Sequence, residues 1–409
     1  MPTLDGVYRR EWGPAVAALA RWSGDLSVAE DAVQEAFAEA LRAWPRDGVP
    51  ANPGGWIVTV ARNRALDRFR RESTRPGREL AAVTDQSRAR MDDEPLQPVR
   101  DDELRMMFTC AHPALDGSSQ LALTLRLISG LTVAEIARAL MQPEATVGQR
   151  ITRAKDKIRT ANIPLRVPAA ELLTERVPHV LGCIYSVFTE GYWSTAGPSA
   201  IRDELCDEGV RLAGEMCALM PRERDADALA ALVLLHDSRR RTRVDDGGAL
   251  VPLDEQDRSL WNADFIAEGV ALISATLGRG PVGPYQLQAA IAALHDEAAT
   301  AAETDWPQIL ALYEVLEKVM PGPVVTLNKA VALGRARGPL AGLAALGELE
   351  GDERMAGNHR VEAVRAHLLE LAGDRAAAHS AYLRAARMTA SVPEQRYLTM
   401  RAALTGSEH

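Results

Sequence analysis

The segment SGLTVAEIARALMQPEATVGQRITRAKDKIR, residues 129–159, constrains the fold more than any other part of the chain. Gly130 is typical of a helix end, and Thr132 with Glu135 predicts a capping box at the start of the next helix. That short helix has one apolar face, and after the turn MQPE a second apolar stripe follows at helical spacing. Two short amphipathic helices joined by a tight turn predict a helix-turn-helix. The two stripes are Val133, Ile136, Ala137 and Leu140, then Val147, Ile151, Ala154 and Ile158.

The second helix of this pair carries polar and basic residues opposite its apolar stripe. Such side chains reach base edges and phosphates in a major groove. One position departs from the usual pattern, because Met141 stands where the turn often has glycine, so the backbone there must avoid a positive φ or carry strain. The candidate DNA-contacting residues are Thr146, Gln149, Arg150, Arg153 and Lys155.

Basic charge is concentrated in two short stretches of an otherwise acidic chain, whose formal net charge is -9. Residues 62–75 contain six arginines against two acids, and residues 149–160 contain five basic residues against one acid. Only the local potential, within about 10 Å, acts on phosphates at cellular salt. An acidic protein can therefore bind DNA through two such surfaces.

Two further helices are expected before residue 75. Ser27 and Glu30 predict a capping box, followed by an apolar stripe that runs from Ala29 to Trp44. The opposite face, with Asp31, Gln34 and Glu35, is either solvated surface or a docking face.

The next helix is expected to begin at Pro53, after the capping residue Asn52. Its apolar side is Trp56, Ile57, Val60 and Ala61. Its basic end suits phosphate and base contact, although arginines at a helix end also complement the helix dipole. The residues expected to be exposed there are Arg62, Asn63, Arg64, Asp67, Arg70 and Arg71.

Three segments together resemble the sigma-2 and sigma-4 domains of group IV, or extracytoplasmic-function (ECF), RNA polymerase sigma factors: AEDAVQEAFAEAL (29–41), GGWIVTVARNRALDRFRR (54–71) and residues 123–158. The resemblance covers about the first 165 residues. It implies that Asp31, Gln34 and Glu35 dock on core RNA polymerase, and that Asn63 and the neighbouring arginines open and read the minus-10 element. The helix-turn-helix would bind the minus-35 element of promoter DNA.

This resemblance organises the chain into a sigma-2-like domain (1–75), an acidic linker (76–100), a sigma-4-like domain (101–165) and an extension (170–409). In the family such a linker threads toward the polymerase active centre, where MDDE (91–94) would mimic nucleic-acid charge. The expected fold class is all-α.

The extension has the features of a helical-repeat array. Tyr313 and Tyr382 occupy equivalent positions of tetratricopeptide-like helices and lie close to two 34-residue periods apart. FTEGYWSTAGP (188–198) and VDDGGALVPLDEQDRSLW (244–261) are expected as its long loops, and SRRRTR (238–243) as a solvated helix end. The layout resembles a subgroup of ECF sigma factors with a long C-terminal repeat extension, which implies an intramolecular or protein partner for the repeats.

Two alternatives remain open. The dipeptides His236-Asp237 and His295-Asp296 are similar to the ligand pair of metal-dependent phosphohydrolases, but His and Asp lacking a fuller ligand set are more typical of local pairing, so we expect no metal, cofactor or catalytic residue. A repressor fused to a repeat scaffold would also contain a helix-turn-helix.

Composition fits a cytoplasmic protein with no membrane partner. No apolar run approaches the roughly 20 residues of a membrane span, and Glu11 stands where a signal peptide has its apolar centre. The cysteines, which lack metal-ligand spacing, are expected to be buried thiols. They are Cys110, Cys183, Cys206 and Cys217.

Overall fold

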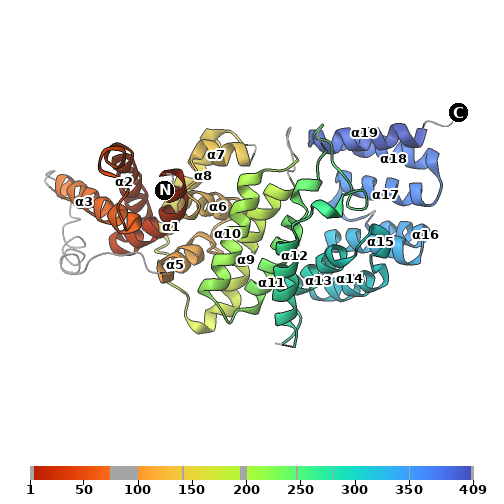
Figure 1. Ribbon diagram of the computed structural model, residues 1–409, viewed down its shortest axis with the longest axis horizontal. Helices are drawn as coiled ribbons and strands as arrows, with labels where there is room; N and C mark the ends of the chain where they lie inside the picture. Colours follow the sequence, from red (N-terminus) through yellow and green to blue (C-terminus); the bar gives the residue numbers. More distant parts are fainter. Residues whose placement is uncertain are drawn as a thin grey trace. The chain divides into compact units, whose positions relative to one another are not determined.

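The computed structural model describes residues 4–73, 100–140, 142–193, 200–245, 247–278, 280–349 and 351–406. Within these ranges the regular elements are helices, and the β pairing is an isolated bridge between Val244 and Leu250 (Figure 1). The expected all-α fold class is confirmed. The chain forms two compact units, residues 1–186 and 187–409. The expected linker, apart from Arg100, lies outside the described residues, as does MDDE.

The first unit contains three long helices followed by a set of shorter ones and the first part of α9, which continues into the second unit. Their bounds are α1 (Leu4–Ser23), α2 (Leu26–Asp47), α3 (Pro53–Ser73), α5 (Arg100–Cys110), α6 (Gly117–Leu123), the π-helical turn η1 (Thr124–Ile128), α7 (Val133–Ala139), α8 (Glu144–Thr160) and α9 (Ala170–Tyr192).

Helix α1 joins the two sigma-like segments into one core. It packs on α2 and α3 on one side and on α5 and η1 on the other. The indole of Trp12, 1% exposed, donates a hydrogen bond to the carbonyl of Arg126 at 3.2 Å. Gly130 has a φ of +72°, and a Cβ there would lie 2.8 Å from Cγ of Trp12. Glycine is therefore required at this position both by the backbone and by the close approach of the ring.

The expected capping box at the start of α2 is wrong. The N-cap is Asp25, whose Oδ1 accepts hydrogen bonds from the amides of Ser27 (2.7 Å) and Val28 (3.1 Å). An aspartate two residues earlier satisfies the free amides of the first turn, so Ser27 lies inside the helix. Glu30 is consequently free of a capping role, and it is buried.

The helix-turn-helix forms as expected from its local signals. The amide of Thr132 donates to Oε2 of Glu135 at 2.7 Å, and the amide of Glu135 donates to Oγ1 of Thr132 at 3.2 Å, which is the predicted capping box. Ile136 and Ala137 are buried, whereas Val133 and Leu140 are half-buried. The stripe of α8 is buried throughout. Met141 lies outside the described residues.

The second unit is a succession of helices, each packed mainly on its neighbours in sequence. Their bounds are α10 (Asp203–Leu219), α11 (Arg224–Asp237), η2 (Arg240–Thr242), η3 (Arg258–Leu260), α12 (Ala263–Thr276), α13 (Pro284–Glu297), η4 (Ala301–Glu303), α14 (Trp306–Val319), α15 (Pro323–Arg337), α16 (Pro339–Leu346), η5 (Gly347–Leu349), η6 (Glu353–Met355), α17 (His359–Leu371), α18 (Arg375–Met388) and α19 (Val392–Gly406).

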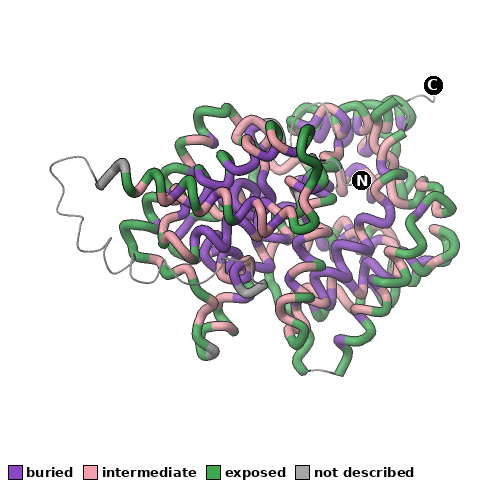
Figure 2. Tube along the Cα trace, turned by 60° about the vertical axis from the view of Figure 1, so that its left-hand side comes forward, coloured by how far each residue is buried: buried purple, intermediate pink, exposed green. Residues whose placement is uncertain are grey.

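Three apolar clusters follow one another along this unit, in α13–α15, in α15–α17 and in α17–α19. Buried and exposed residues alternate around the helices from α14 to α19 (Figure 2), whereas no residue of α11 is exposed. Where α15 and α16 meet, a Cβ on Gly342 would lie 2.6 Å from the carbonyl oxygen of Ala330, so glycine permits the close approach. Local packing of this kind is typical of a helical-repeat array. Tyr382 is buried and Tyr313 is half-buried.

Two expectations for the second unit are wrong. Residues 188–192 belong to α9 and are not a loop. SRRRTR is not a solvated helix end as a whole, because Arg239 is 4% and Arg243 is 8% exposed, although Arg241 is exposed. The guanidinium of Arg243 lies 3.9 Å from the ring centroid of Tyr192 and donates to the carbonyl of the same residue. Aromatic rings and backbone carbonyls thus stabilise buried arginines that the sequence analysis expected to be exposed.

Candidate nucleic-acid interface

Helix α3 presents a polar face because its opposite face is anchored in the core. The helix begins at Pro53, and the side chain of Asn52 accepts a hydrogen bond from the amide of Gly55 at 2.9 Å, as expected. Its buried apolar side chains are Ile57, Val58, Ala61 and Ala65, whereas the expected Trp56 and Val60 are half-buried. The exposed residues on the other side are Asn63, Arg64, Asp67, Arg68 and Arg70.

Arg62 differs from the other residues expected on this face. Its guanidinium lies 5.9 Å from the ring centroid of Trp22, and its side chain is half-buried. A cation over an indole ring is stabilised by the ring quadrupole, which orients Arg62 toward α1. The side chain of Arg71 lies outside the described residues.

The basic face of α3 adjoins the acidic face of α2. Nη1 of Arg68 lies 2.6 Å from Oδ2 of Asp31, and Nη2 of Arg64 lies 3.3 Å from Oε2 of Glu39. These are exposed ion pairs, which contribute about 0–1 kcal/mol each. A stronger partner could therefore displace them.

The side chains expected to face a polymerase lie together on α2. Asp31, Gln34 and Glu35 are all exposed, on the side opposite the buried Val33 and Phe37. The helix spacing that buries an i, i+4 pair necessarily turns these polar neighbours outward. The acidic and basic candidate surfaces thus meet along one side of the α2–α3 pair.

Helix α8 carries the candidate minus-35 residues. Thr146, Gln149 and Arg153 are exposed, opposite the buried stripe. Arg150 is half-buried, and its Nη1 donates a hydrogen bond to the side chain of Gln142 in the turn before the helix. That bond holds the guanidinium near the N-terminal end of α8.

Lys155 has a partner within the protein. Its Nζ binds the carboxylate of Glu30, which also accepts a hydrogen bond from Nε of Arg126. The side chains of Glu30, Arg126 and Lys155 are 9%, 9% and 14% exposed. The structure thus separates Lys155 from the exposed residues of α8 and brings it to α2.

Sequence reasoning missed this Glu30–Arg126–Lys155 cluster. A signal for half of it was present, because Glu30, Val33 and Phe37 share the i, i+3, i+7 spacing of one buried face. The other half comes from η1, in which all five residues are buried and the amide of Ser129 bonds the carbonyl of Thr124 at 3.2 Å. A π-helical turn is not encoded in helical periodicity, so Arg126 gave no comparable signal.

Arg126 is further fixed by its surroundings. Its guanidinium lies 5.4 Å from the ring centroid of Trp12, and its Nη1 donates to the carbonyl of Leu131 at 2.8 Å. Tyr8 donates to the carbonyl of Gly130 at 2.8 Å, and burial raises the pKa of Tyr8 to about 12. These bonds tie α1 and α2 to the segment that precedes the helix-turn-helix.

The two His-Asp dipeptides end α11 and α13, and their aspartates bind arginines. Asp237 lies 3.0 Å from Nε of Arg240, and Asp296 lies 3.3 Å from Nε of Arg239. Burial raises the pKa of each carboxyl to about 6. Among the described residues, no cluster of three or more His, Cys, Asp or Glu side chains is arranged to hold a metal.

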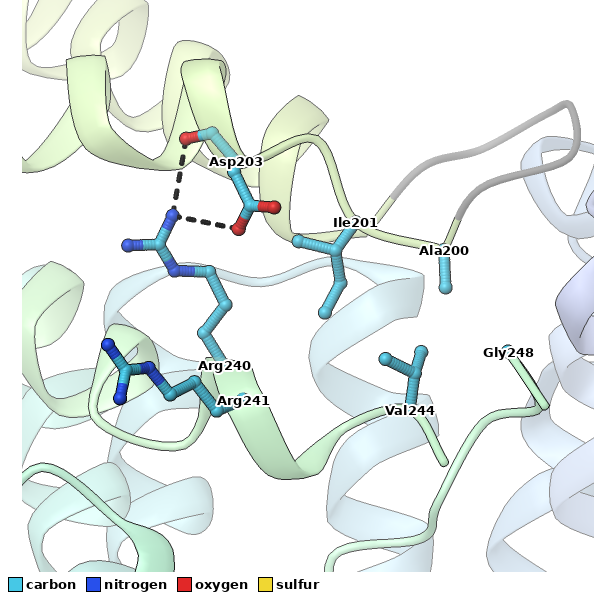
Figure 3. A pocket seen from close by; sticks show the side chains of 7 residues that line it. All are labelled: Ala200, Ile201, Asp203, Arg240, Arg241, Val244 and Gly248. Atoms are coloured by element: carbon cyan, nitrogen blue, oxygen red, sulfur yellow. Dashed lines mark hydrogen bonds and ion pairs between the residues drawn. The ribbon is translucent and has the colours of Figure 1, made fainter. Parts of the chain in front are cut away.

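A cavity of about 450 Å³ is lined by Arg240, the arginine that binds Asp237. Figure 3 shows Arg240 at its wall, reaching the carbonyl and the carboxylate of Asp203, both at 3.2 Å. Arg240 also binds Asp207 at 2.7 Å. Together with Asp237, these acids neutralise the cation, so the cavity does not present Arg240 to an anionic ligand.

The cysteines are free thiols. Cys110, Cys183 and Cys206 are buried as expected, whereas Cys217 is half-buried. Burial raises the pKa of Cys183 to about 11 and that of Cys206 and Cys217 to about 12. Thiols of this kind stay protonated and unreactive near neutral pH. In the described ranges, no helix is long and apolar enough to cross a membrane.

Three family models match the chain. They are Sigma-70 region 2 over residues 8–75, Sigma-70 region 4 over residues 105–158, and a family of unknown function (DUF6596) over residues 176–277. The first two matches coincide with α1–α3 and with the segment from α5 to α8. No solved structure matches.

Relatives match along different parts of the chain. The uncharacterized protein R00370 of Rhizobium meliloti (strain 1021) is 42% identical over 390 residues, 94% of this chain and 92% of that protein. The probable ECF RNA polymerase sigma factor SigI of Mycobacterium tuberculosis is 32% identical over 37% of this chain and 52% of its own length. The ECF RNA polymerase sigma factor SigK of Mycobacterium ulcerans is 30% identical over 34% of this chain and 75% of its own length. With both sigma-70 regions present in order and three quarters of an ECF sigma factor matched, the chain belongs to the ECF RNA polymerase sigma factors.

Proposed function

We propose that this sigma factor binds core RNA polymerase through the exposed face of α2 and reads promoter DNA with α3 and α8. The polymerase-binding residues are Asp31, Gln34 and Glu35. The minus-10 residues are Arg62, Asn63, Arg64, Asp67, Arg70 and Arg71. The minus-35 residues are Thr146, Gln149, Arg150 and Arg153, with Lys155 joining them only if its bond to Glu30 opens.

One observation carries this proposal. Two basic helices of an acidic chain each bury an apolar stripe and leave an amide and arginines exposed on the opposite side. Asn63 with Arg64 on α3 and Gln149 with Arg153 on α8 supply the donors and acceptors that recognise base edges, together with the charge that binds phosphates. Neither helix needs these residues for its own packing.

The ion pair between Arg68 and Asp31 suggests how binding starts. The pair is exposed, so its loss costs little. A basic surface of the polymerase can form an ion pair with Asp31, and DNA phosphates can form an ion pair with Arg68. Binding of polymerase would thus break one ion pair of Arg68 before promoter DNA meets α3.

Run-off transcription tests the proposal. The full chain, purified core polymerase and the DNA upstream of its own gene should together give a defined transcript. A helix-turn-helix repressor fused to a repeat scaffold would bind that DNA without binding core enzyme. Promoter binding without core binding or a transcript would favour the repressor and contradict the sigma assignment of α2.

Charge reversal on α2 separates the two surfaces. Glu35→Lys should weaken core binding in a pull-down or fluorescence titration while leaving binding of the minus-35 duplex unchanged. Asp156→Lys is the matched control, since Asp156 is also exposed but lies on α8. If both variants bind core like the wild type, α2 is not the docking face.

We further propose that residues 170–409 form a tetratricopeptide-like array that modulates transcription, through contact with the promoter-binding domains or with a protein partner. The connection TANIPLRVPAAE (160–171) is short and contains two prolines, so the array has a high effective concentration near those domains. The favoured effect is activation, because an inhibitory role alone would not need an array of this size.

Truncation of the chain tests the activating role, and the contacts of α9 determine where the fragment should end. Nη2 of Arg176 donates to the carbonyl of Phe108 at 3.0 Å, and the hydroxyl of Thr124 lies 3.2 Å from Sγ of Cys183. A cut at residue 169 would remove these contacts, whereas fragment 1–193 retains them. The fragment should stay helical by circular dichroism and transcribe less than the full chain. Equal or greater transcription by a folded fragment would replace activation with autoinhibition or an unrelated sensory role.

A further inference from the structure

A second cavity, of about 260 Å³, lies within the second unit. Its wall is built from segments distant in sequence: the loop before η3, the end of α13, α14, α15 and α17. Arg258, His295, Trp306, Arg335 and His367 line it, so cationic and aromatic groups gather there. Unlike Arg240 at the larger cavity, the cations here are not surrounded by carboxylates.

Arg335 is the cation available to a ligand. Its side chain is 23% exposed, and its guanidinium lies 5.0 Å from the ring centroid of Trp306. Its ion pair with Oδ2 of Asp254 is long, at 3.7 Å, and the Asp254 side chain is 44% exposed. Such a pair contributes little and can exchange partners.

Arg258 supplies a second, fixed charge. Its Nη1 donates to the carbonyls of His295 and of Ala298, the latter at 2.7 Å, and its guanidinium lies 4.5 Å from the ring centroid of Trp261. These contacts hold the guanidinium in place without a carboxylate. A preorganised cation of this kind loses little side-chain entropy when an anion binds.

Both histidines of the cavity are neutral near pH 7. Burial, and then the charges of Arg239, Arg258 and Arg335, lower the pKa of His295 to about 3. Burial also lowers the pKa of His367. The lining therefore has two guanidiniums and one carboxylate, that of Asp254, while the buried Asp296 behind Arg258 also pairs with Arg239, so the cavity favours anions.

Trp306 contributes an aromatic ring to the wall of the cavity. The ring centroids of His295 and Trp306 are 5.2 Å apart, so the indole contacts both that imidazole and the Arg335 guanidinium. The indole Nε1 is buried and has no hydrogen-bond acceptor among the described residues. Because this nitrogen is shielded from solvent, the cavity presents the indole ring, and not its N–H, to a ligand.

We propose that this cavity binds a small organic anion whose planar or apolar part lies beside Trp306 and whose acidic group replaces Asp254 at Arg335. Its volume of about 260 Å³ exceeds the roughly 150 Å³ of a cavity that holds benzene, so a benzene ring bearing one acidic group fits. The guanidinium fork favours carboxylate or phosphate groups, because it can donate two parallel hydrogen bonds to either. Such a ligand would make the second unit responsive to a metabolite, independently of how α2, α3 and α8 bind polymerase and promoter.

Ligand-observed NMR on the full-length protein tests this proposal, with benzoate, phenyl phosphate and the uncharged benzamide as probes. Benzoate or phenyl phosphate should bind, benzamide should bind at least tenfold more weakly, and the tighter of the two anions identifies the acidic group. Arg335→Gln should weaken the anion at least tenfold, as loss of a charge-assisted bidentate contact does. Arg337→Gln is the matched control, since Arg337 lies on the same helix, is 63% exposed and pairs with Glu314 at 3.4 Å.

Three results would overturn the proposal: no anion binding better than benzamide, equal binding by wild type and Arg335→Gln, or equal weakening by Arg337→Gln. The comparison of anions with benzamide uses only the wild-type protein, so a folding defect in a variant cannot obscure it. Circular dichroism of both variants establishes that each remains helical. Failure here leaves the transcription assays of the first unit unaffected.

Discussion

Removing the carboxylate of Glu30 should loosen the first unit. Glu30 is the common partner of Arg126 and Lys155, and the side chains of all three are at least 86% buried. Glu30→Ala leaves a guanidinium and an ammonium close together without their counter-charge. Breaking a buried ion pair in this way costs about 3–5 kcal/mol. Lys155, the most exposed member, can turn toward water, so we expect a cost near the lower end, about 3 kcal/mol.

Hydrogen exchange followed by mass spectrometry measures this effect locally, which matters because a chain of two units need not unfold in one step. A loss of about 3 kcal/mol corresponds to a fall in amide protection of roughly two orders of magnitude. It should appear in α2, η1 and α8 and be absent from α17–α19. Glu35→Ala, an exposed site on the same helix, is the control.

The triple variant Glu30→Met, Arg126→Met, Lys155→Met supplies an independent check. Replacing a whole buried ionic cluster by apolar residues of similar volume is often neutral or stabilising, so protection should return toward the wild-type level. If Glu30→Ala changes exchange in α8 no more than Glu35→Ala does, the cluster does not hold α2 to the helix-turn-helix segment, and the reasoning fails.

Three further predictions concern DNA recognition and pH. Gln149→Ala or Arg150→Ala should weaken minus-35 binding by about 1–3 kcal/mol and relax base preference, measured by fluorescence anisotropy on base-substituted duplexes; Arg159→Ala, at the far end of α8, serves as control, and wild-type selectivity in both variants would contradict the placement. Asn63→Ala should impair promoter opening more than closed-complex binding, measured by permanganate reactivity of the minus-10 region, and equal losses in the two steps would count against that role. His295 has a folded-state pKa of about 3, below the ordinary 6.5, so the unfolded chain takes up its proton first and the free energy of unfolding should fall as pH drops from 6.5 toward 3; His295→Gln should flatten that dependence in urea titrations, and an unchanged slope would refute it.

The sequence alone determined the structural features that depend on residues close together in the chain. The start of α3 at Pro53, the box of Thr132 and Glu135, and the buried stripe of α8 all formed as expected. Each depends on backbone amides or apolar side chains no more than about four residues apart, so the sequence of one segment specifies it. The exposed faces of α2, α3 and α8 follow from the same periodicity.

Only the tertiary structure determined which charged side chains are buried. Glu30 has the local spacing of a capping residue, but Asp25 caps the helix instead. The Glu30 side chain is buried and binds two cations, which lie 96 and 125 residues away in the sequence. Arg239 and Arg243 have the local appearance of a solvated helix end and are buried against partners such as Asp296 and Tyr192. Burying a charge is favourable only when a counter-charge, a carbonyl or an aromatic face is already in place, and those groups come from helices that periodicity within one segment cannot bring together.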